Sequence, residues 1–170
     1  MNSCRIRRAT PADASSIARI RSETIRTVVA PLGQYTPQEI DAWASNYSAE
    51  MVLRFMSEAT LYVAVDASDA VLGFGRFRVD DRGEAIIQGV FVAASHVGRG
   101  IGSVILSRLL ADIDALGTRV TNITATLNAR SFYERHGFVA LEFIRHESPT
   151  GADIPAIRMR RDRSDKLPVS

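Results

Sequence analysis

The chain has 170 residues, of which 46% are hydrophobic and 24% charged, a balance typical of one soluble globular domain. A net charge of +2 makes no case for nucleic-acid binding, and Cys4, the only cysteine, excludes an intramolecular disulfide and a cysteine-built metal site. The chain has no apolar run near the roughly 20 residues that span a bilayer, and it begins without the apolar core of a signal peptide, so we expect no membrane partner and a cytoplasmic location.

The N-terminal part of the chain carries two clear helix starts. Thr10-Pro11-Ala12-Asp13 and Thr36-Pro37-Gln38-Glu39 each place a capping threonine before a proline, with an acid at the third helical position. Apolar residues at helical spacing continue the first helix to about Val29, and Pro31-Leu32-Gly33 ends it. The expected elements here are a strand over 5–8 and helices over 10–29, 36–43 and 49–57.

The remainder of the chain alternates β-rich runs with turn signals. Asp80-Asp81-Arg82-Gly83 predicts a hairpin turn, and Gly117 is a natural stop for an amphipathic helix that begins near Ile101. The expected elements are strands over 60–65, 71–79, 84–92, 120–126, 138–146 and 154–161, a helix over 101–116, and a short helix capped by Asn128 and stopped at Gly137.

This order of elements predicts an α+β (mixed α/β) fold. We expect a mostly antiparallel central sheet flanked by helices, with one parallel pair in which the long helix joins the strand over 84–92 to the strand over 120–126. The domain should occupy residues 1–161, and residues 162–170 should form a disordered tail.

Gly98-Arg99-Gly100-Ile101-Gly102-Ser103 is the most informative stretch of the chain. It lies between the apolar run over 86–92 and the long amphipathic helix, so it predicts a glycine-rich turn at a helix N-terminus. Such a turn directs several backbone N–H groups and the positive end of a helix dipole at one spot, and glycines let a ligand approach the main chain. The stretch therefore predicts a seat for a phosphate or pyrophosphate, with an ordinary tight turn as the alternative.

Together with a second motif, this loop resembles the GCN5-related N-acetyltransferase (GNAT) family. Val90-Phe91-Val92 matches the family's apolar-aromatic-Val strand end, and Phe132 to Phe138 matches its Phe-Tyr-Glu-x-x-Gly-Phe segment. Val97-Gly98-Arg99-Gly100-Ile101-Gly102 matches its Gln/Arg-x-x-Gly-x-Gly/Ala loop, except that Val97 replaces Gln or Arg. Because the loop works through main-chain amides, this departure need not abolish binding.

The resemblance implies the GNAT fold and acetyl-CoA as the acetyl donor. The three scattered histidines and the carboxylates show no metal-ligand spacing, so we expect no metal. The resemblance also implies that the two parallel strands splay apart, that the pantetheine arm pairs with Phe91 and Val92, and that a backbone N–H near Val92 stabilises the oxyanion. Tyr133 is then the acid that protonates the leaving thiolate, although a core aromatic is the plainer interpretation, and Asn128 binds the arm, caps its helix, or both. The residues implied to bind the donor are Phe91, Val92, Val97, Gly98, Arg99, Gly100, Ile101, Gly102, Ser103, Asn128 and Tyr133.

The sequence leaves the catalytic base and the acceptor side open. Glu84, acting through an ordered water, is the candidate base, and the other candidates are Glu142, His146 and Glu23. Tyr35 and Trp43 lie in a segment that resembles many members of the family, so they are candidate walls of the acceptor site, with a core position as the alternative for Trp43.

Three functions compete at this point. The leading hypothesis is an acetyl-CoA-dependent N-acetyltransferase that moves an acetyl group to a primary amine of a small molecule or peptide by direct attack in a ternary complex. The second is a non-catalytic acyl-CoA-binding or sensing module on the same fold. A dinucleotide-binding oxidoreductase fits poorly, because Ser103 or Ile105 stands where the last glycine is needed. Dimers are common on this fold, which leaves a homodimer open.

Overall fold

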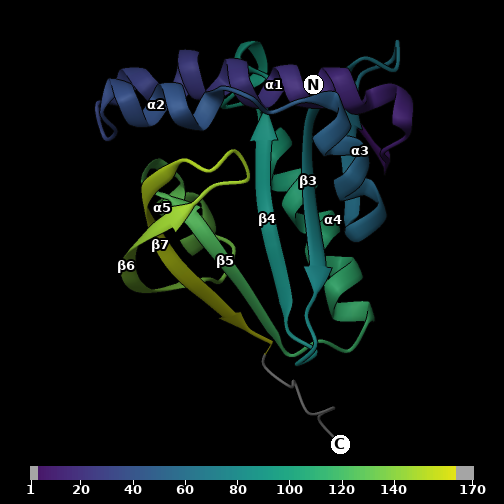
Figure 1. The fold of residues 1–170 in the computed structure, drawn as a ribbon. Helices are drawn as coiled ribbons and strands as arrows, with labels where there is room; N and C mark the ends of the chain where they lie inside the picture. Colours follow the sequence, from purple (N-terminus) through teal and green to yellow (C-terminus); the bar gives the residue numbers. More distant parts are fainter. Residues whose placement is uncertain (1–3, 164–170) are drawn as a thin grey trace, which may run out of the picture.

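Seven strands form one sheet in the computed structural model, which describes residues 4–163. Their order is β1-β2-β3-β4-β5-β7-β6, and every neighbouring pair is antiparallel except β4 with β5. This topology confirms the expected sheet with one parallel pair (Figure 1). The strands are β1 (Arg5–Arg8), β2 (Thr60–Val65), β3 (Val71–Val79), β4 (Ala85–Val92), β5 (Val120–Thr126), β6 (Val139–Glu147) and β7 (Asp153–Asp162).

Both expected helix starts are present. Thr36 Oγ1 accepts a hydrogen bond from the Glu39 N–H at 3.2 Å, and the Glu39 carboxylate accepts one from the Thr36 N–H at 3.0 Å. At the first start, the Asp13 carboxylate accepts the Thr10 N–H at 2.7 Å. The α-helices are α1 (Ala14–Thr24), α2 (Pro37–Ala44), α3 (Ala49–Glu58), α4 (Ile101–Ala115) and α5 (Arg130–Glu134), and short 3-10 turns cover Pro11–Asp13, Ala30–Leu32, Ala94–His96 and Leu127–Ala129.

The first helix reaches Val29 by a different route from the one expected. After Thr24 the chain makes one π-helical turn, η2 (Ile25–Val29), and the following 3-10 turn ends at Gly33, whose φ is 71°. Ile25 and Val29 are both buried, so the wider turn keeps both side chains in the core. Single π-turns within helices are frequent at functional sites, and this one borders the pocket described below.

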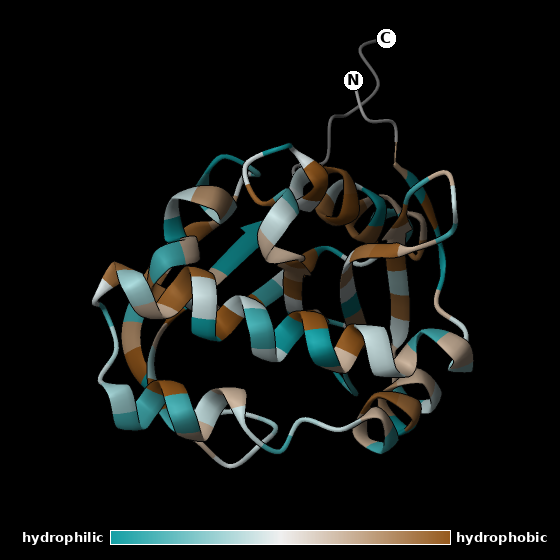
Figure 2. Cartoon of the chain, turned by 90° about the horizontal axis from the view of Figure 1, so that it is seen from above, coloured by the Kyte–Doolittle hydropathy of each residue, from teal (hydrophilic) through white to brown (hydrophobic). Residues whose placement is uncertain are grey.

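Helix α4 packs against one face of the sheet, and α1 and α3 cover the other face (Figure 1). Gly75 permits the close approach of α4, because a Cβ at this position would lie 2.7 Å from Ile105 Cγ2 and 3.1 Å from Leu109 Cδ1. Figure 2 shows hydrophilic and hydrophobic segments alternating along the helices, as expected when each helix buries one face. Ile105 and Leu109 are fully buried and lie at the centre of this core.

The C-terminal strand extends past the expected end of the domain. β7 runs to Asp162, and Arg163 donates from its backbone N–H to the Arg119 carbonyl at 2.8 Å. Sheet pairing with Val120 holds Asp162 in place, which corrects the expectation of a tail beginning there. The rest of the expected tail, 164–170, lies outside the described residues. Within residues 4–163, no helix is long and apolar enough to cross a membrane.

The packing of α4 predicts the effect of a core substitution. We expect Ile105→Ala to lower the free energy of unfolding by about 2–5 kcal/mol, because it removes buried methyl groups between the helix and the sheet. Val104→Ala is the matched control on the same helix, since Val104 is 44% exposed, and it should change stability by no more than about 0.5 kcal/mol. Urea denaturation of both variants measures the difference, and equal losses would contradict this packing.

Candidate active site

The parallel strands β4 and β5 are paired over only part of their length. Their register joins Ala85, Ile86 and Ile87 to residues 121–123, and beyond this point β5 continues beside β7 alone. Figure 1 shows the gap between β4 and β5 widening toward α1. Gly89 adopts a φ of 124°, which a residue with a Cβ rarely takes, and so permits β4 to bend where the pairing ends. The structure therefore has the split that the family resemblance implied.

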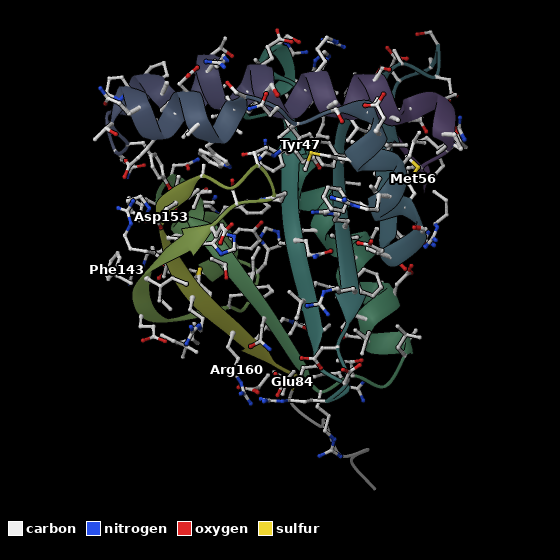
Figure 3. All side chains as sticks on the ribbon, in the orientation of Figure 1. Tyr47, Met56, Glu84, Phe143, Asp153 and Arg160 are labelled. Atoms are coloured by element: carbon white, nitrogen blue, oxygen red, sulfur yellow. The ribbon has the colours of Figure 1, made fainter. Side chains whose placement is uncertain are left out.

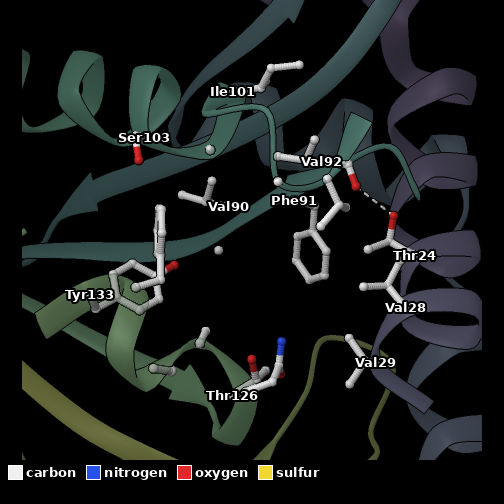
Figure 4. Close-up of a pocket in the computed structure, with 18 of the residues that line it drawn as sticks. Thr24, Val28, Val29, Val90, Phe91, Val92, Ile101, Ser103, Thr126 and Tyr133 are labelled. Carbon is white, nitrogen blue, oxygen red and sulfur yellow. Dashed lines mark hydrogen bonds between the residues drawn. The ribbon is translucent and has the colours of Figure 1, made fainter. Parts of the chain in front are cut away.

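A pocket of about 430 Å³ occupies the split (Figure 4). It is bounded by the end of β4, the glycine loop, the start of α4, the end of β5, α5, and the C-terminal part of the first helix. Eleven of the residues singled out from the sequence line it: Trp43, Phe91, Val92, Val97, Gly98, Gly100, Ile101, Gly102, Ser103, Asn128 and Tyr133. Arg99 is exposed and lies outside this lining, as do Glu84 and Tyr35.

The glycine loop ends at an uncapped helix N-terminus. Gly100 is the N-cap of α4, with a φ of 79° and no side chain to satisfy the first amides. The first helical bond runs from the Val104 N–H to the Gly100 carbonyl, so the amides of Ile101, Gly102 and Ser103 have no partner within the helix. Space around Gly98 and Gly100 is open, since a Cβ at either would meet nothing within 4 Å. The free amides and the helix dipole make this end of the pocket suited to an anion.

The end of β4 directs backbone groups into the pocket. The Ala93 N–H bonds the Leu72 carbonyl at 2.8 Å, on the β3 side. Because successive residues of a strand direct their N–H and C=O groups to opposite edges, those of Val92 face the split. The Thr24 hydroxyl confirms this direction, since it donates to the Val92 carbonyl at 2.8 Å (Figure 4). The Val92 N–H is thus a donor toward the pocket, beside a carbonyl that is already bonded.

Tyr133 belongs to both the core and the pocket. Its ring is 3% exposed and packs edge-on against Phe132 and Phe138, with centroids 5.0 Å and 5.6 Å away. The hydroxyl points into the pocket (Figure 4) and makes no hydrogen bond with any residue in the described range. Burial raises the pKa of Tyr133 above its ordinary value, so the hydroxyl carries its proton at neutral pH and is a donor.

Asn128 is not a helix cap. It lies inside the 3-10 turn Leu127–Ala129, where no side-chain capping bond forms, which corrects one of its two expected roles. Its Oδ1 is buried in the pocket lining without a hydrogen-bond partner. A buried acceptor without a partner is costly, so this oxygen is suited to an N–H of a bound ligand.

Tyr35, a predicted wall of the acceptor site, lies outside the lining of this pocket. Its hydroxyl accepts the Leu127 N–H at 2.8 Å and donates to the Pro155 carbonyl at 3.1 Å, so it ties β7 to the turn that follows β5. Tyr35 is buried and packs against Trp43, with ring centroids 5.4 Å apart. Trp43 is also buried and does reach the pocket, so only one of this pair can contact a ligand there.

Glu84 is also displaced from its expected role. It precedes β4 at the end of the strand remote from the pocket, about 26 Å of extended chain from Val92. Figure 3 places Glu84 beside Arg160, at the opposite end of the sheet from Tyr47, and its carboxylate accepts a hydrogen bond from Asn122 Nδ2 at 2.6 Å. Glu84 is close to Val90-Phe91-Val92 in the sequence, but the two lie far apart in space because they are at opposite ends of an extended strand.

The other candidate bases also lie away from the pocket. Glu142 pairs with Arg158 across β6 and β7, and Glu23 pairs with Arg19 along α1. His146 is on β6, where burial lowers its pKa. No carboxylate belongs to the pocket lining, whose titratable side chains are those of His96, Tyr133 and Arg135. The described residues also contain no cluster of His, Cys, Asp or Glu that could hold a metal ion.

Thr24, Val28 and Val29 line the pocket although the sequence did not indicate them. The helical periodicity places Thr24 and Val28 on the inward face of the first helix, but nothing local shows that this face meets the end of β4. The contact depends on a bond between residues 68 positions apart, from Thr24 to Val92.

A family model for the acetyltransferase (GNAT) domain matches residues 31–162 of this chain. The chain belongs to the GNAT family. It is similar to the uncharacterized N-acetyltransferase YafP of Escherichia coli (strain K12), with 29% identity over 139 residues that cover 81% of this chain and 83% of YafP. The resemblance seen in the loop and the Phe-Tyr-Glu segment is thereby confirmed at the level of the family.

Two solved structures show the same fold. The GCN5-related N-acetyltransferase described as a class-II aminotransferase from Rhodopseudomonas palustris has a TM-score of 0.84 at 22% identity, covering 96% of this chain and 98% of its own. The GNAT-superfamily phosphinothricin acetyltransferase of Sinorhizobium meliloti, solved in complex with acetyl-CoA, has a TM-score of 0.74 at 23% identity, covering 97% and 90%. This chain therefore shares its overall fold with both proteins.

The hydroxyls of Tyr35 and Tyr133 predict different effects of their removal on stability. Tyr35→Phe should lower the free energy of unfolding by about 1–3 kcal/mol, because it leaves the Leu127 N–H and the Pro155 carbonyl without their partner. Tyr133→Phe removes a hydroxyl with no protein partner and should change it by less than about 0.5 kcal/mol. Thermal unfolding compares the two, and faster hydrogen exchange at the Leu127 amide should accompany only the first. The reverse order of stabilities would contradict these assignments.

Proposed function

We propose that the protein is an acetyl-CoA-dependent N-acetyltransferase that transfers the acetyl group to a primary amine of a small molecule or peptide, by direct attack in a ternary complex. One observation carries the proposal. The split between β4 and β5 exposes backbone donors along a pocket that ends at the uncapped N-terminus of α4. A long donor with an anionic segment and an amide-bearing arm matches that arrangement.

The residues present fit acetyl-CoA at both of its polar parts. The free amides of Ile101, Gly102 and Ser103 would hold the diphosphate, and the open space at Gly98 and Gly100 gives it room. The unpartnered Oδ1 of Asn128 would accept an N–H of the pantetheine arm. Acetyl-CoA supplies an acetyl group that is activated as a thioester.

Two groups of this chain are placed to assist the transfer. The Val92 N–H faces the split and would stabilise negative charge on the acetyl oxygen as the amine attacks. The Tyr133 hydroxyl points into the same pocket, stays protonated because burial raises its pKa, and would donate to the departing sulfur. Thr24 holds the Val92 peptide group in orientation through the Val92 carbonyl.

The attacking amine must first lose its proton, since a lysine-like amine has a pKa of about 10.4 in water. Because no carboxylate lines the pocket, we propose that this proton passes to solvent water on the acceptor side rather than to an acidic side chain. The nitrogen loses a second proton as the C–N bond forms and the C–S bond breaks, and this proton would restore the Tyr133 hydroxyl that protonated the thiolate. The lack of a carboxylate in the pocket lining also supports a second candidate function, a non-catalytic acyl-CoA-binding module. Steady CoA release with an amine panel distinguishes the enzyme from the module.

Binding of the donor should depend on the glycine loop. We expect wild-type protein to bind CoA and acetyl-CoA in calorimetry, and Gly100→Val to weaken both by at least about tenfold, because valine is strained at a φ of 79° and displaces the first amides of α4. Gly117→Val is the matched control, since Gly117 has a φ of 77° and open surroundings at the far end of the same helix. The Gly117→Val variant should lose about as much free energy of unfolding as Gly100→Val, and should keep the wild-type affinity for CoA and acetyl-CoA. Folded wild-type protein that binds neither compound would remove the basis of the proposal.

The role of Tyr133 is tested separately by turnover. With an amine that the wild type acetylates, Tyr133→Phe should lower kcat by about a hundredfold and leave the KM for acetyl-CoA within a few-fold, because the hydroxyl acts on the departing sulfur and not on the diphosphate. CoA release with a thiol reagent measures both constants. A kcat near that of the wild type would make Tyr133 a packing residue only.

A further inference from the structure

Two arginines are buried on the sheet face opposite α4 without an acidic partner. Arg21 of α1 is 3% exposed and Arg76 of β3 is 4% exposed. Both interact with Tyr47, which precedes α3 and lies below α1 beside the upper end of β4 (Figure 3). Neither arginine has a role in the donor pocket described above.

A continuous series of contacts links these arginines to the pocket. The Arg76 guanidinium carbon lies 3.6 Å from the Phe55 ring centroid, and the Phe55 and Tyr47 centroids are 6.0 Å apart. The Arg21 guanidinium carbon lies 4.1 Å from the Tyr47 centroid and 5.8 Å from that of Phe91. Phe91 lines the donor pocket, so its ring separates Arg21 from that pocket, whose lining does not include Arg76 or Tyr47.

The hydrogen bonding of the cluster is incomplete. Arg21 Nη1 donates to the Trp43 carbonyl at 2.9 Å, whereas Arg76 Nη1 is buried with no partner. Burial is the main cause that lowers the pKa of Arg21 to about 10, and the nearby charge of Arg76 contributes to the same lowering. Glu58, whose charge acts on Arg76, is exposed at the end of α3 and makes no hydrogen bond to it.

Two other partly buried arginines, Arg7 and Arg161, are paired with carboxylates. Arg7 makes two bonds to Asp13, at 2.7 Å and 3.0 Å, and Arg161 makes two bonds to Asp114, both at 3.0 Å. Burying unpaired cations is costly, because the lost hydration is not replaced. Two adjacent guanidinium groups without a carboxylate therefore point to an anion supplied from outside the chain.

The cluster is close to the point of acetyl transfer. Arg21 precedes Thr24 by three residues on α1, so the two side chains leave the same face of the helix about 4.5 Å apart along its axis. Thr24 bonds the Val92 carbonyl, whose N–H faces the split. An anion held by Arg21 would thus lie on the same face of α1 as the Thr24–Val92 bond.

We propose that Arg21, Arg76 and Tyr47 form a subsite for the carboxylate of the acceptor, and that the natural acceptors are small amines bearing a carboxylate, of the amino-acid type. The inference rests on the proposed acetyltransferase function. A guanidinium group presents parallel N–H donors that match a carboxylate, and the Tyr47 hydroxyl adds another donor. The burial of both arginines favours small acceptors over the side chains of folded proteins.

The test compares matched acceptors. Wild-type protein is assayed by CoA release with each of the common L-amino acids and with the corresponding carboxamides, which differ only in the charge of the tested group. We expect at least one amino acid to exceed its carboxamide by about tenfold or more in kcat/KM. Turnover of amines without any preference for a carboxylate would overturn the subsite and leave the acetyltransferase function standing.

Variants of the arginines test whether the preference for a carboxylate depends on Arg76. Arg76→Met keeps the apolar stem over Phe55, so it should raise the KM for the preferred amino acid by at least about tenfold, leave its carboxamide within about threefold, and retain thermal stability. Arg78→Met is the control, because Arg78 is exposed two residues further along the same strand. Equal losses for both acceptors would show that Arg76 only supports the fold.

Two outcomes need a further measurement: a variant that does not fold, and a wild-type protein that acetylates no amine. If Arg76→Met does not fold, Tyr47→Phe and Arg76→Lys are compared in the same assay, and the same loss of selectivity for the carboxylate is expected. If no amine is acetylated at all, the proposed transfer fails, and thermal shift then decides the subsite. Amino acids should raise the Tm of wild-type protein while their carboxamides do not, and the absence of this difference would overturn the inference.

Discussion

The separation of β4 from β5 is the constraint on which the rest of this structure depends. A sheet normally satisfies its backbone groups by continuous pairing, and groups left unpaired in the interior are costly. Here the pairing stops after Ile87 and Ile123, near the centre of a seven-stranded sheet. The opening leaves backbone donors and acceptors facing the pocket, where a ligand with amide groups of its own could pair with them.

Several contacts hold the opening in place. Gly89 permits the bend of β4, and the Thr24 hydroxyl bonds the carbonyl that β5 would otherwise face. On the other side, Tyr35 joins β7 to the turn after β5. The π-turn Ile25–Val29 places the first helix along the rim of the same pocket. The site is thus built from helix and strand ends that are fixed by tertiary contacts, which favours precise positioning of a reacting group.

The site has two regions whose electrostatics would favour an anionic ligand. The start of α4 presents free amides and the positive end of a helix dipole, while Arg21 and Arg76 present buried cations near Phe91. Both regions would favour anions, and Val92 lies at the end of β4 beside Phe91, which contacts Arg21. A donor with phosphates and an acceptor with a carboxylate would each be held by charge at one end and meet near Val92.

The sequence by itself determined the order of elements, the parallel pair, the glycine loop and the family, because these depend on local signals: helix caps, apolar periodicity and glycines at turns. Only the tertiary structure decided which side chains share the pocket. It placed Glu84 at the remote end of β4, turned Tyr35 into a tie between strands, and left Asn128 Oδ1 without a partner. It also brought Arg21 next to Tyr47 and Arg76. These outcomes depend on contacts between residues far apart in the chain, for which periodicity and spacing carry no information.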